Sequence, residues 1–209
     1  TGLTAGAYNI TVTDVNGCTA AISPVDITIT EPDALTLIVN EVNRATCSGD
    51  ADGSAEAIVG GGTGIGTYTY LWNDDPDPLL AQTASIATGL SAGTYEVTIN
   101  DASGTCPDET QSVIITEPDP IVANLTVVPV NCFGGDDGEA SVSPIGGTQY
   151  IDPAGILNLG QPYTYSWTTG SITASSDGLD ATIPYFVTIT DSLLCSTGAL
   201  AVPISQPVA

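Results

Sequence analysis

The chain has 209 residues, with 24 Asp and Glu side chains against one basic residue and no histidine, which gives a formal net charge of -23. This balance excludes nucleic acid and anionic lipid as partners, because both are bound through Lys and Arg. Hydrophobic residues make up 42% and charged residues only 12%, so the chain can bury a core and is not a disordered acidic tail, while the absence of a run of about 18 apolar residues excludes membrane insertion.

The first predicted element is a strand within GLTAGAYNITVTDVNGC, which starts at Gly2 and alternates apolar with polar side chains. The same phrase returns as GLSAGTYEVTINDASGTC from Gly89 and, more loosely, as GLDATIPYFVTITDSLLC from Gly178. Each copy is followed by a motif that ends in proline: ITEP, ITEP and ISQP. The chain is therefore a tandem array.

A second pair of phrases fixes the repeat boundaries. CSGDADGSAEAIVGGGT starts at Cys47 and CFGGDDGEASVSPIGGT at Cys132, and each is followed by a TYTYLW or PYTYSW segment. We interpret residues 1–34 as the C-terminal part of a truncated repeat, 35–120 as one complete repeat and 121–209 as another. The sequence is expected to be a window cut from a longer array.

Each complete repeat is predicted to consist of short strands, because helical spacing is nowhere sustained and Gly and Pro punctuate runs rich in Thr, Val, Ile and Tyr. Roughly seven short strands in such a repeat predict an all-β fold of tandem immunoglobulin-like sandwiches arranged end to end. Besides the recurring phrase and one or two weaker strands, the expected strands cover 35–45, 53–60, 67–73 and 110–117, and then 121–131, 138–145, 162–168 and 198–205.

Aromatic residues mark the expected core. Trp72 and Trp167 lie where a sandwich places its core tryptophan, on the third strand. Tyr8 and Tyr95 open the recurring strand after Gly-Leu-x-Ala-Gly and predict a tyrosine corner, in which the hydroxyl bonds to the preceding backbone. Tyr185 follows Thr-Ile-Pro instead, so its corner departs from the pattern.

The ordered motifs CxGxxDGxA, GGT, YTYxW, GLxAGxYxVTxxD with a cysteine, and ITEP closely resemble the SprB-type repeat of Bacteroidota cell-surface adhesins. The resemblance covers essentially the whole chain. It implies a fold related to polycystic-kidney-disease (PKD) and immunoglobulin-like sandwiches, export by type IX secretion, and long extracellular filaments on the bacterial cell surface, the best-known of which act in gliding motility. It implies no catalytic site. The insertion at 149–161 departs from the shorter connection of the first repeat, and we favour a tolerated surface elaboration over a ligand loop.

The cysteines have two possible pairings. Spacing along the chain suggests Cys47 with Cys106 and Cys132 with Cys195, within each repeat. In an immunoglobulin-like sandwich, however, the two loops concerned lie at opposite poles, roughly 20 Å apart, whereas a disulfide tolerates at most about 7 Å between Cα atoms. We therefore favour a bond between repeats, Cys47 with Cys195, which leaves Cys18, Cys106 and Cys132 without partners in this sequence.

Carboxylates gather in loops, and hard oxygen ligands at domain poles are what calcium prefers. A solvated acidic surface that prevents aggregation is the default interpretation, and no other cofactor is expected, since the absence of His and of a CxxC pair disfavours zinc. The candidate calcium ligands are Asp33, Asp50, Asp52, Asp101, Asp119, Asp136 and Asp137. Separately, Asp191-Ser192-Leu193 resembles the O-glycosylation tripeptide of Bacteroidota, which makes Ser192 a candidate acceptor.

The leading functional prediction is a structural spacer in a secreted adhesin filament that holds an adhesive tip away from the cell, with neighbouring repeats as its partners. The short prolyl joins at 31–33 and 117–120 favour a stiff array. One alternative is a carbohydrate-binding surface module with polysaccharide as its partner, and a further one is a strand-exchanged subunit of an extracellular fibre. An enzyme is not expected, because carboxylates have neither His nor Lys to assist them.

Overall fold

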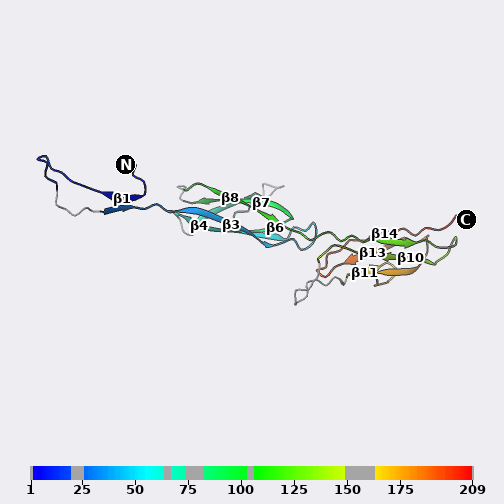
Figure 1. The fold of residues 1–209 in the computed structure, drawn as a ribbon. Coiled ribbons are helices and arrows are strands. Elements are labelled where there is room, and N and C mark those ends of the chain that lie inside the picture. The colour runs from blue at the N-terminus through cyan, green and yellow to red at the C-terminus, as the bar shows by residue number, and fades with distance from the viewer. Residues whose placement is uncertain are drawn as a thin grey trace. The chain divides into compact units, whose positions relative to one another are not determined.

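The computed structural model describes residues 2–19, 26–63, 67–73, 82–102, 106–148 and 163–208. In these parts of the chain every regular element is a β-strand (Figure 1), and no helix is present that would be long and apolar enough to cross a membrane. By its internal contacts the chain divides into two compact units, formed by Thr1–Ile38, Ala57–Ser85 and Glu96–Gln111, and by Val39–Glu56, Ile86–Tyr95 and Ser112–Ala209. The predicted repeat boundaries at 34 and 120 follow the sequence and stay a prediction.

Residues 33–115 form two three-stranded sheets, with strand orders β3-β4-β6 and β5-β7-β8. These correspond to strands A, B and E in one sheet and C, F and G in the other, as in an immunoglobulin-like sandwich. The described pairs β4–β6 and β5–β7 are antiparallel. The bounds are β3 Asp33–Asn43, β4 Gly53–Gly62, β5 Tyr68–Asn73, β6 Ile86–Leu90, β7 Gly93–Asp101 and β8 Glu109–Ile115.

Residues 125–202 repeat the arrangement with orders β12-β10-β9 and β11-β13-β14, all described pairs being antiparallel. The predicted strands therefore exist in both repeats, and β6 and β12 are the weaker ones expected before the recurring phrase. The bounds are β9 Leu125–Val128, β10 Gly138–Val142, β11 Thr164–Trp167, β12 Ser175–Leu179, β13 Tyr185–Thr190 and β14 Leu200–Val202.

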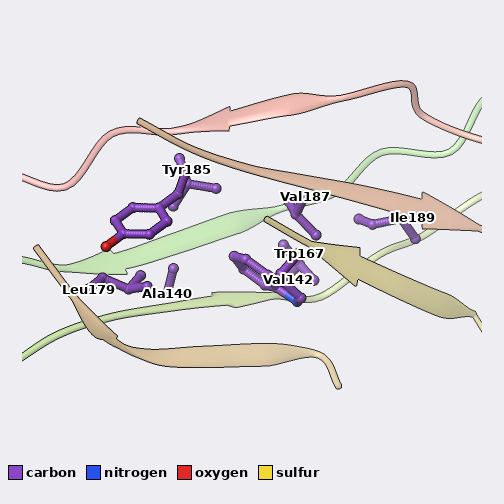
Figure 2. Packing of buried hydrophobic residues seen from close by; sticks show 8 residues of the cluster. Ala140, Val142, Trp167, Leu179, Tyr185, Val187 and Ile189 are labelled. Carbon is purple, nitrogen blue, oxygen red and sulfur yellow. The ribbon is translucent and has the colours of Figure 1, made fainter. Parts of the chain in front are cut away.

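The second sandwich buries one apolar cluster between its sheets (Figure 2). Every second residue of β13 points into it, because side chains alternate across a strand. Trp167 is 4% exposed, and its indole N–H donates to the carbonyl of Thr173 at 2.8 Å, so the polar atom of this large side chain is satisfied. The buried cluster comprises Ala140, Val142, Trp167, Leu179, Tyr185, Val187, Ile189 and Val202.

The first sandwich has the equivalent core tryptophan. Trp72 is fully buried, and its indole N–H donates to the carbonyl of Ala84 at 2.9 Å. Buried residues come from strands of both sheets. Leu35 of β3 and Ala57 of β4 belong to one sheet, and Val97 of β7 belongs to the other. The sequence thus places both tryptophans correctly on strand C.

The recurring phrase begins with a tyrosine corner in two of its three copies. The hydroxyl of Tyr8 donates to the carbonyl of Thr4 at 2.7 Å, and that of Tyr95 to Ser91 at 3.0 Å. In the third copy the hydroxyl of Tyr185 instead accepts from the backbone N–H of Asp180 at 3.1 Å. The corner after Thr-Ile-Pro therefore closes with the opposite hydrogen-bond direction.

The first copy of the phrase forms a two-stranded antiparallel sheet, β1 (Gly6–Asn9) with β2 (Asp26–Ile29). These strands hold the positions that F and G hold in the complete repeats. Its apolar side chains are largely exposed, Ile10 and Val12 at 53% each.

Candidate functional site

The A–B loop of the first repeat (residues 45–52) follows β3 and carries Cys47. The backbone N–H of Thr46 donates to Asp52 at 2.8 Å, and the hydroxyl of Thr46 donates to the other carboxylate oxygen. Hydrogen bonds from the Thr46 hydroxyl and then from its backbone N–H favour the charged form, so the pKa of Asp52 lies below its ordinary value. The Asp52 carboxylate therefore acts as a clamp across the loop.

The proline motif supplies a second clamp. Glu117 of ITEP accepts from the backbone N–H of Gly49 at 2.6 Å, and the backbone N–H of Ala45 donates to Thr116 at 2.9 Å. The side chain of Glu41 in turn accepts from the backbone and hydroxyl of Thr116, at 2.8 and 2.9 Å. The ITEP motif thus holds the A–B loop in place, in addition to ending strand G.

The A–B loop of the second repeat (residues 130–137) is clamped in the same way. Asn131 donates to Asp137 from its backbone N–H at 3.0 Å and from its side-chain amide at 2.5 Å, and these bonds lower the pKa of Asp137. Gln206 of ISQP accepts from the backbone N–H of Gly134 at 2.9 Å. Cys132 occupies the position of Cys47.

The F–G loop of the second repeat (residues 191–195) is organised by a buried carboxylate. Asp191 is 3% exposed. One of its oxygens accepts from the backbone N–H groups of Leu193 and Cys195 at 2.9 and 3.0 Å, and the other accepts from that of Thr148 at 2.7 Å. Three backbone donors on one carboxylate fix this loop against the GGT segment of the same repeat. Leu194 completes the turn with a φ of 70°.

The GGT segment needs Gly147 to approach this carboxylate. Gly147 has a φ of +69°, and a Cβ atom on it would lie 2.8 Å from Asp191 Oδ2. Tyr163 also binds this segment, since its hydroxyl donates to the carbonyl of Gly146 at 2.6 Å. Burial, with a smaller contribution from the Asp191 charge, raises the pKa of Tyr163.

The first repeat has the same pair of elements. Asp101 is fully buried and accepts from the backbone N–H of Thr63 at 2.6 Å and from its hydroxyl at 2.8 Å. A Cβ atom on Gly62 would lie 2.6 Å from this carboxylate. The aspartate that ends strand F and the GGT motif are therefore one structural unit.

A disulfide joins the A–B loop of the first repeat to the F–G loop of the second. The Cα atoms of Cys47 and Cys195 are 5.5 Å apart, and the two residues are 148 apart in sequence. The hydroxyl of Thr148 donates to the carbonyl of Thr46 at 3.4 Å, and the sulfur of Cys195 lies 3.5 Å from the same oxygen. Because a disulfide sulfur carries no hydrogen, the second approach is a packing contact.

This pair is the one that the pole geometry favours, and the alternative, Cys47 with Cys106 and Cys132 with Cys195, is wrong for this structure. Pairing the cysteines by their proximity in sequence gives the wrong partners, because the two cysteine-bearing loops of one sandwich lie at opposite ends of its strands. The remaining thiols are free: Cys18 and Cys132 are exposed, and Cys106 is partly exposed.

The candidate calcium ligands are not gathered into a site within the described residues, where no three His, Cys, Asp or Glu side chains converge on one point. Asp52, Asp101 and Asp137 are engaged in the hydrogen bonds given above. Calcium binding stays a prediction. The four remaining candidates are all exposed: Asp33, Asp50, Asp119 and Asp136.

A shallow hollow of about 320 Å³ lies on the sheet of β9, β10 and β12. Its lining is rich in hydroxyl groups and includes two carboxylates, of Glu139 and Asp177, and no aromatic side chain. Such a lining can form hydrogen bonds with a polyol, but it lacks the flat aromatic surface on which sugar rings stack. The other lining residues are Thr126, Val128, Ala140, Ser141, Ser171, Thr173, Ser175 and Ser176.

Two further predicted features are the glycosylation candidate Ser192 and the insertion at 149–161. Ser192 is exposed, and its hydroxyl lies 3.4 Å from the carbonyl of Thr148, so its modification stays a prediction. The insertion at 149–161 lies outside the described residues.

Sequence reasoning missed the roles of Asp191, Thr148 and Glu117. A usable signal was present, because GGT and the strand-end aspartate recur together in each complete repeat. Taken separately, the aspartate resembles a metal ligand and GGT resembles a turn. Only their co-occurrence indicates that one binds the other.

The family model of the SprB repeat matches residues 40–76 and 124–172 of this chain. The two matched segments include the A–B loop, strand B and strand C of each repeat, and they carry a cysteine motif and a GGT motif each. The chain is thus similar to the SprB repeat at two places. No curated protein matches it.

Among solved structures, the chain is similar to three N-terminal domains of the bacteriophage RB49 Highly Immunogenic Outer Capsid protein, with 15% identity, a TM-score of 0.37, and coverage of 82% of this chain and 59% of that one. It is similar to Sidekick-1 immunoglobulin domains 1–5 at 10% identity and a TM-score of 0.37, covering 96% and 46%. It is also similar to the fibronectin(III)-like modules of Clostridium thermocellum CbhA at 12% identity and a TM-score of 0.28, covering 82% and 95%. The chain spans about half of the length of the first two.

Proposed function

We propose that this chain is a spacer segment of a large secreted adhesin, whose repeats carry mechanical load between the bacterial cell surface and a distal adhesive region. The SprB repeat matches support the adhesin assignment. The disulfide supports an extracellular location, since such bonds persist in oxidising compartments. Export by type IX secretion, membership of a long filament and a part in gliding motility belong to the same proposal, and no catalytic activity is included in it.

The observation that carries the proposal is the covalent joint between Cys47 and Cys195. Tension applied to the two ends of the chain passes through this bond, so the residues between the two cysteines bear no stretching force. These residues span 148 positions and would extend by roughly 500 Å if pulled out, at about 3.4 Å per residue. The joint thus takes β4 to β13 out of the load path, as a spacer requires, whereas β3 and β14 stay in it.

Force spectroscopy on the chain held by its ends tests this role. The oxidised chain should lack roughly 500 Å of the extension that the reduced chain and a Cys195→Ser variant release, at about 3.4 Å per residue. The Cys106→Ser variant is the matched control and should behave as wild type, because Cys106 is a free thiol. If the oxidised chain releases its full length at low force, the load-bearing role is wrong.

The carbohydrate-binding alternative is favoured by one observation, the hydroxyl-lined hollow on β9, β10 and β12. A glycan array probed with the whole chain tests it, with Glu139→Gln as the variant that removes one carboxylate from the hollow. Binding that this variant abolishes would favour the binding module over the spacer. The absence of an aromatic platform in the hollow leads us to rank the spacer first.

A further inference from the structure

The hollow on the sheet of β9, β10 and β12 is formed where the second repeat has small side chains and the first has large ones. Ser141 and Ser175 are register partners on β10 and β12. The equivalent partners in the first repeat are Glu56 and Ile86, since both pairs follow a bulge at the glycine that begins strand B. Ile86 is 45% exposed and therefore covers the outer face of its sheet. Two serines in place of a glutamate and an isoleucine leave open space on the second sheet, as part of the hollow of about 320 Å³.

Two carboxylates line this hollow from neighbouring strands. Glu139 and Asp177 hold the positions at which the first repeat pairs Ser54 with Thr88 across the ladder. Within the described residues, neither carboxylate forms a hydrogen bond or an ion pair. Like charges that face each other across a ladder destabilise a sheet. The first repeat avoids this repulsion with neutral side chains, whereas the second retains a repulsion that a bound cation would remove.

The hydroxyl groups of the hollow add further acceptors. Ser171 and Thr173 each donate their only hydroxyl hydrogen to the carbonyl of Ser175, both at 2.8 Å, so they present only lone pairs to a ligand. Ionised carboxylates are also acceptors only. The hydroxyls of Thr126, Ser141 and Ser175 can donate or accept. The hollow is thus rich in acceptors, and a matching ligand is positively charged and rich in hydrogen-bond donors.

We propose that the hollow binds a protonated amino sugar, with the ammonium group at Glu139 and Asp177 and the sugar hydroxyls at the Ser and Thr side chains. A hydrogen bond between an ammonium and a carboxylate is about twice as strong as a neutral one. The charge therefore supplies affinity in a site that has no aromatic platform. The inference rests on the carbohydrate-binding alternative and names its ligand. It is independent of the load-bearing joint, because a spacer can carry a site on the outer face of a sheet.

Two other cationic ligands fit the hollow less well. A calcium ion takes about six to eight oxygen ligands, and in the described part of the chain no three His, Cys, Asp or Glu side chains converge. The lysine side chain of a partner protein would bring a long apolar stem that needs apolar surface. The lining offers little of it, because Val128 is accessible but Ala140 is only 2% exposed. A sugar brings hydroxyl groups instead, which match the Ser and Thr side chains.

The test compares two oligosaccharides with the same backbone, a glucosamine oligomer with free amino groups and its fully N-acetylated form, which is uncharged. Each is titrated into the whole chain by calorimetry at about pH 5.5, where free carboxylic acids are ionised and amines carry a proton. The free-amine oligomer should bind at least about tenfold more tightly, which corresponds to about 1.4 kcal/mol. Its changes in backbone amide NMR signals should centre on β10 and β12.

Three variants separate the site from the general negative charge of the chain. Glu139→Gln combined with Asp177→Asn removes both charges at nearly constant size and should abolish the difference between the two oligomers. The matched control, Glu96→Gln combined with Glu109→Gln, removes as many charges from exposed positions on β7 and β8 and should preserve the difference. Ser175→Ile leaves the net charge unchanged, fills the hollow as the first repeat does at this position, and should weaken binding about tenfold.

The possible failures are distinguishable. Equal affinity for the two oligomers would overturn the amino-sugar assignment but leave the carbohydrate-binding alternative standing, whereas no binding of either would refute both. An equal loss of binding in the Glu96 and Glu109 control would reduce the effect to non-specific attraction and overturn the site. Tighter binding of calcium ions or of a lysine-rich peptide, lost with the Glu139 and Asp177 charges, would assign the hollow to that ligand instead. None of these results bears on the force test of the disulfide joint.

Discussion

The strongest prediction concerns Asp191, whose carboxylate accepts three backbone N–H groups from two loops. We expect Asp191→Asn to destabilise the second sandwich severely. The asparagine oxygen can still serve Leu193 and Cys195, but without charge, and its NH2 group faces the N–H of Thr148, donor against donor. At 3% exposure for Asp191, water cannot replace the lost acceptor.

The magnitude follows from the three bonds. A hydrogen bond to a charged group contributes about 1.5–3 kcal/mol and a neutral one about 1 kcal/mol, so two weakened bonds and one lost bond cost about 4 kcal/mol. With a urea slope of about 2 kcal/mol per M, the unfolding midpoint should fall by about 2 M. The second sandwich is thus expected to lose a large part of its total stability.

Urea unfolding with the disulfide intact, followed by hydrogen exchange of the β13 segment, measures this cost. The matched control is Asp14→Asn, which removes the charge from the same two loop bonds at an exposed aspartate. Because Asp14 lies in solvent, we expect its loss to cost about 1 kcal/mol at most. A midpoint for Asp191→Asn within experimental error of wild type, or equal costs for the two variants, would refute the reasoning from burial and charge.

Three other perturbations have definite expected results. Replacing both Cys47 and Cys195 by Ser should cost up to about 5 kcal/mol of unfolding free energy from chain entropy over their separation of 148 residues, and dithiothreitol should lower the wild-type midpoint but not that of the variant. Leu194→Gly should raise the melting temperature, since a φ of 70° strains a non-glycine residue by about 1 kcal/mol and its side chain is 83% exposed; a lower melting temperature would contradict this. Because hydrogen bonds from Thr46 lower the pKa of Asp52 below 3.8 in the folded state, its contribution to stability is present above that pH and is lost as pH falls through the folded value. The stability difference between wild type and Asp52→Asn, measured by urea titration, should therefore shrink at acid pH, and a constant difference would count against the clamp.

Local sequence pattern was sufficient for the strands. Alternation in the recurring phrase predicted β7 and β13, and their inward residues are the buried ones, Val97 and Ile99 in one copy and Val187 and Ile189 in the other. The period of side-chain burial on a strand depends only on the backbone, so it can be read from a few consecutive residues. The same holds for the tryptophan of strand C, which lies two residues after an inward tyrosine.

Tyr185 shows the limit of that reasoning. Its place at the start of strand F was predicted from the phrase, but the direction of its hydrogen bond changed because Thr-Ile-Pro alters the preceding turn. When the turn in a motif is substituted, the motif still predicts the position of the side chain but no longer predicts the hydrogen bond that the side chain makes.

The repeat order, the strands and the positions of the core aromatics were thus determined by the sequence alone. The choice between Cys106 and Cys195 as the partner of Cys47 depended on which loops share a pole, and the roles of Asp191 and Glu117 became visible only with the tertiary structure. Burial periodicity is a property of neighbouring residues, whereas a disulfide or a carboxylate clamp joins atoms that the fold brings together from distant positions, and no local pattern specifies that meeting.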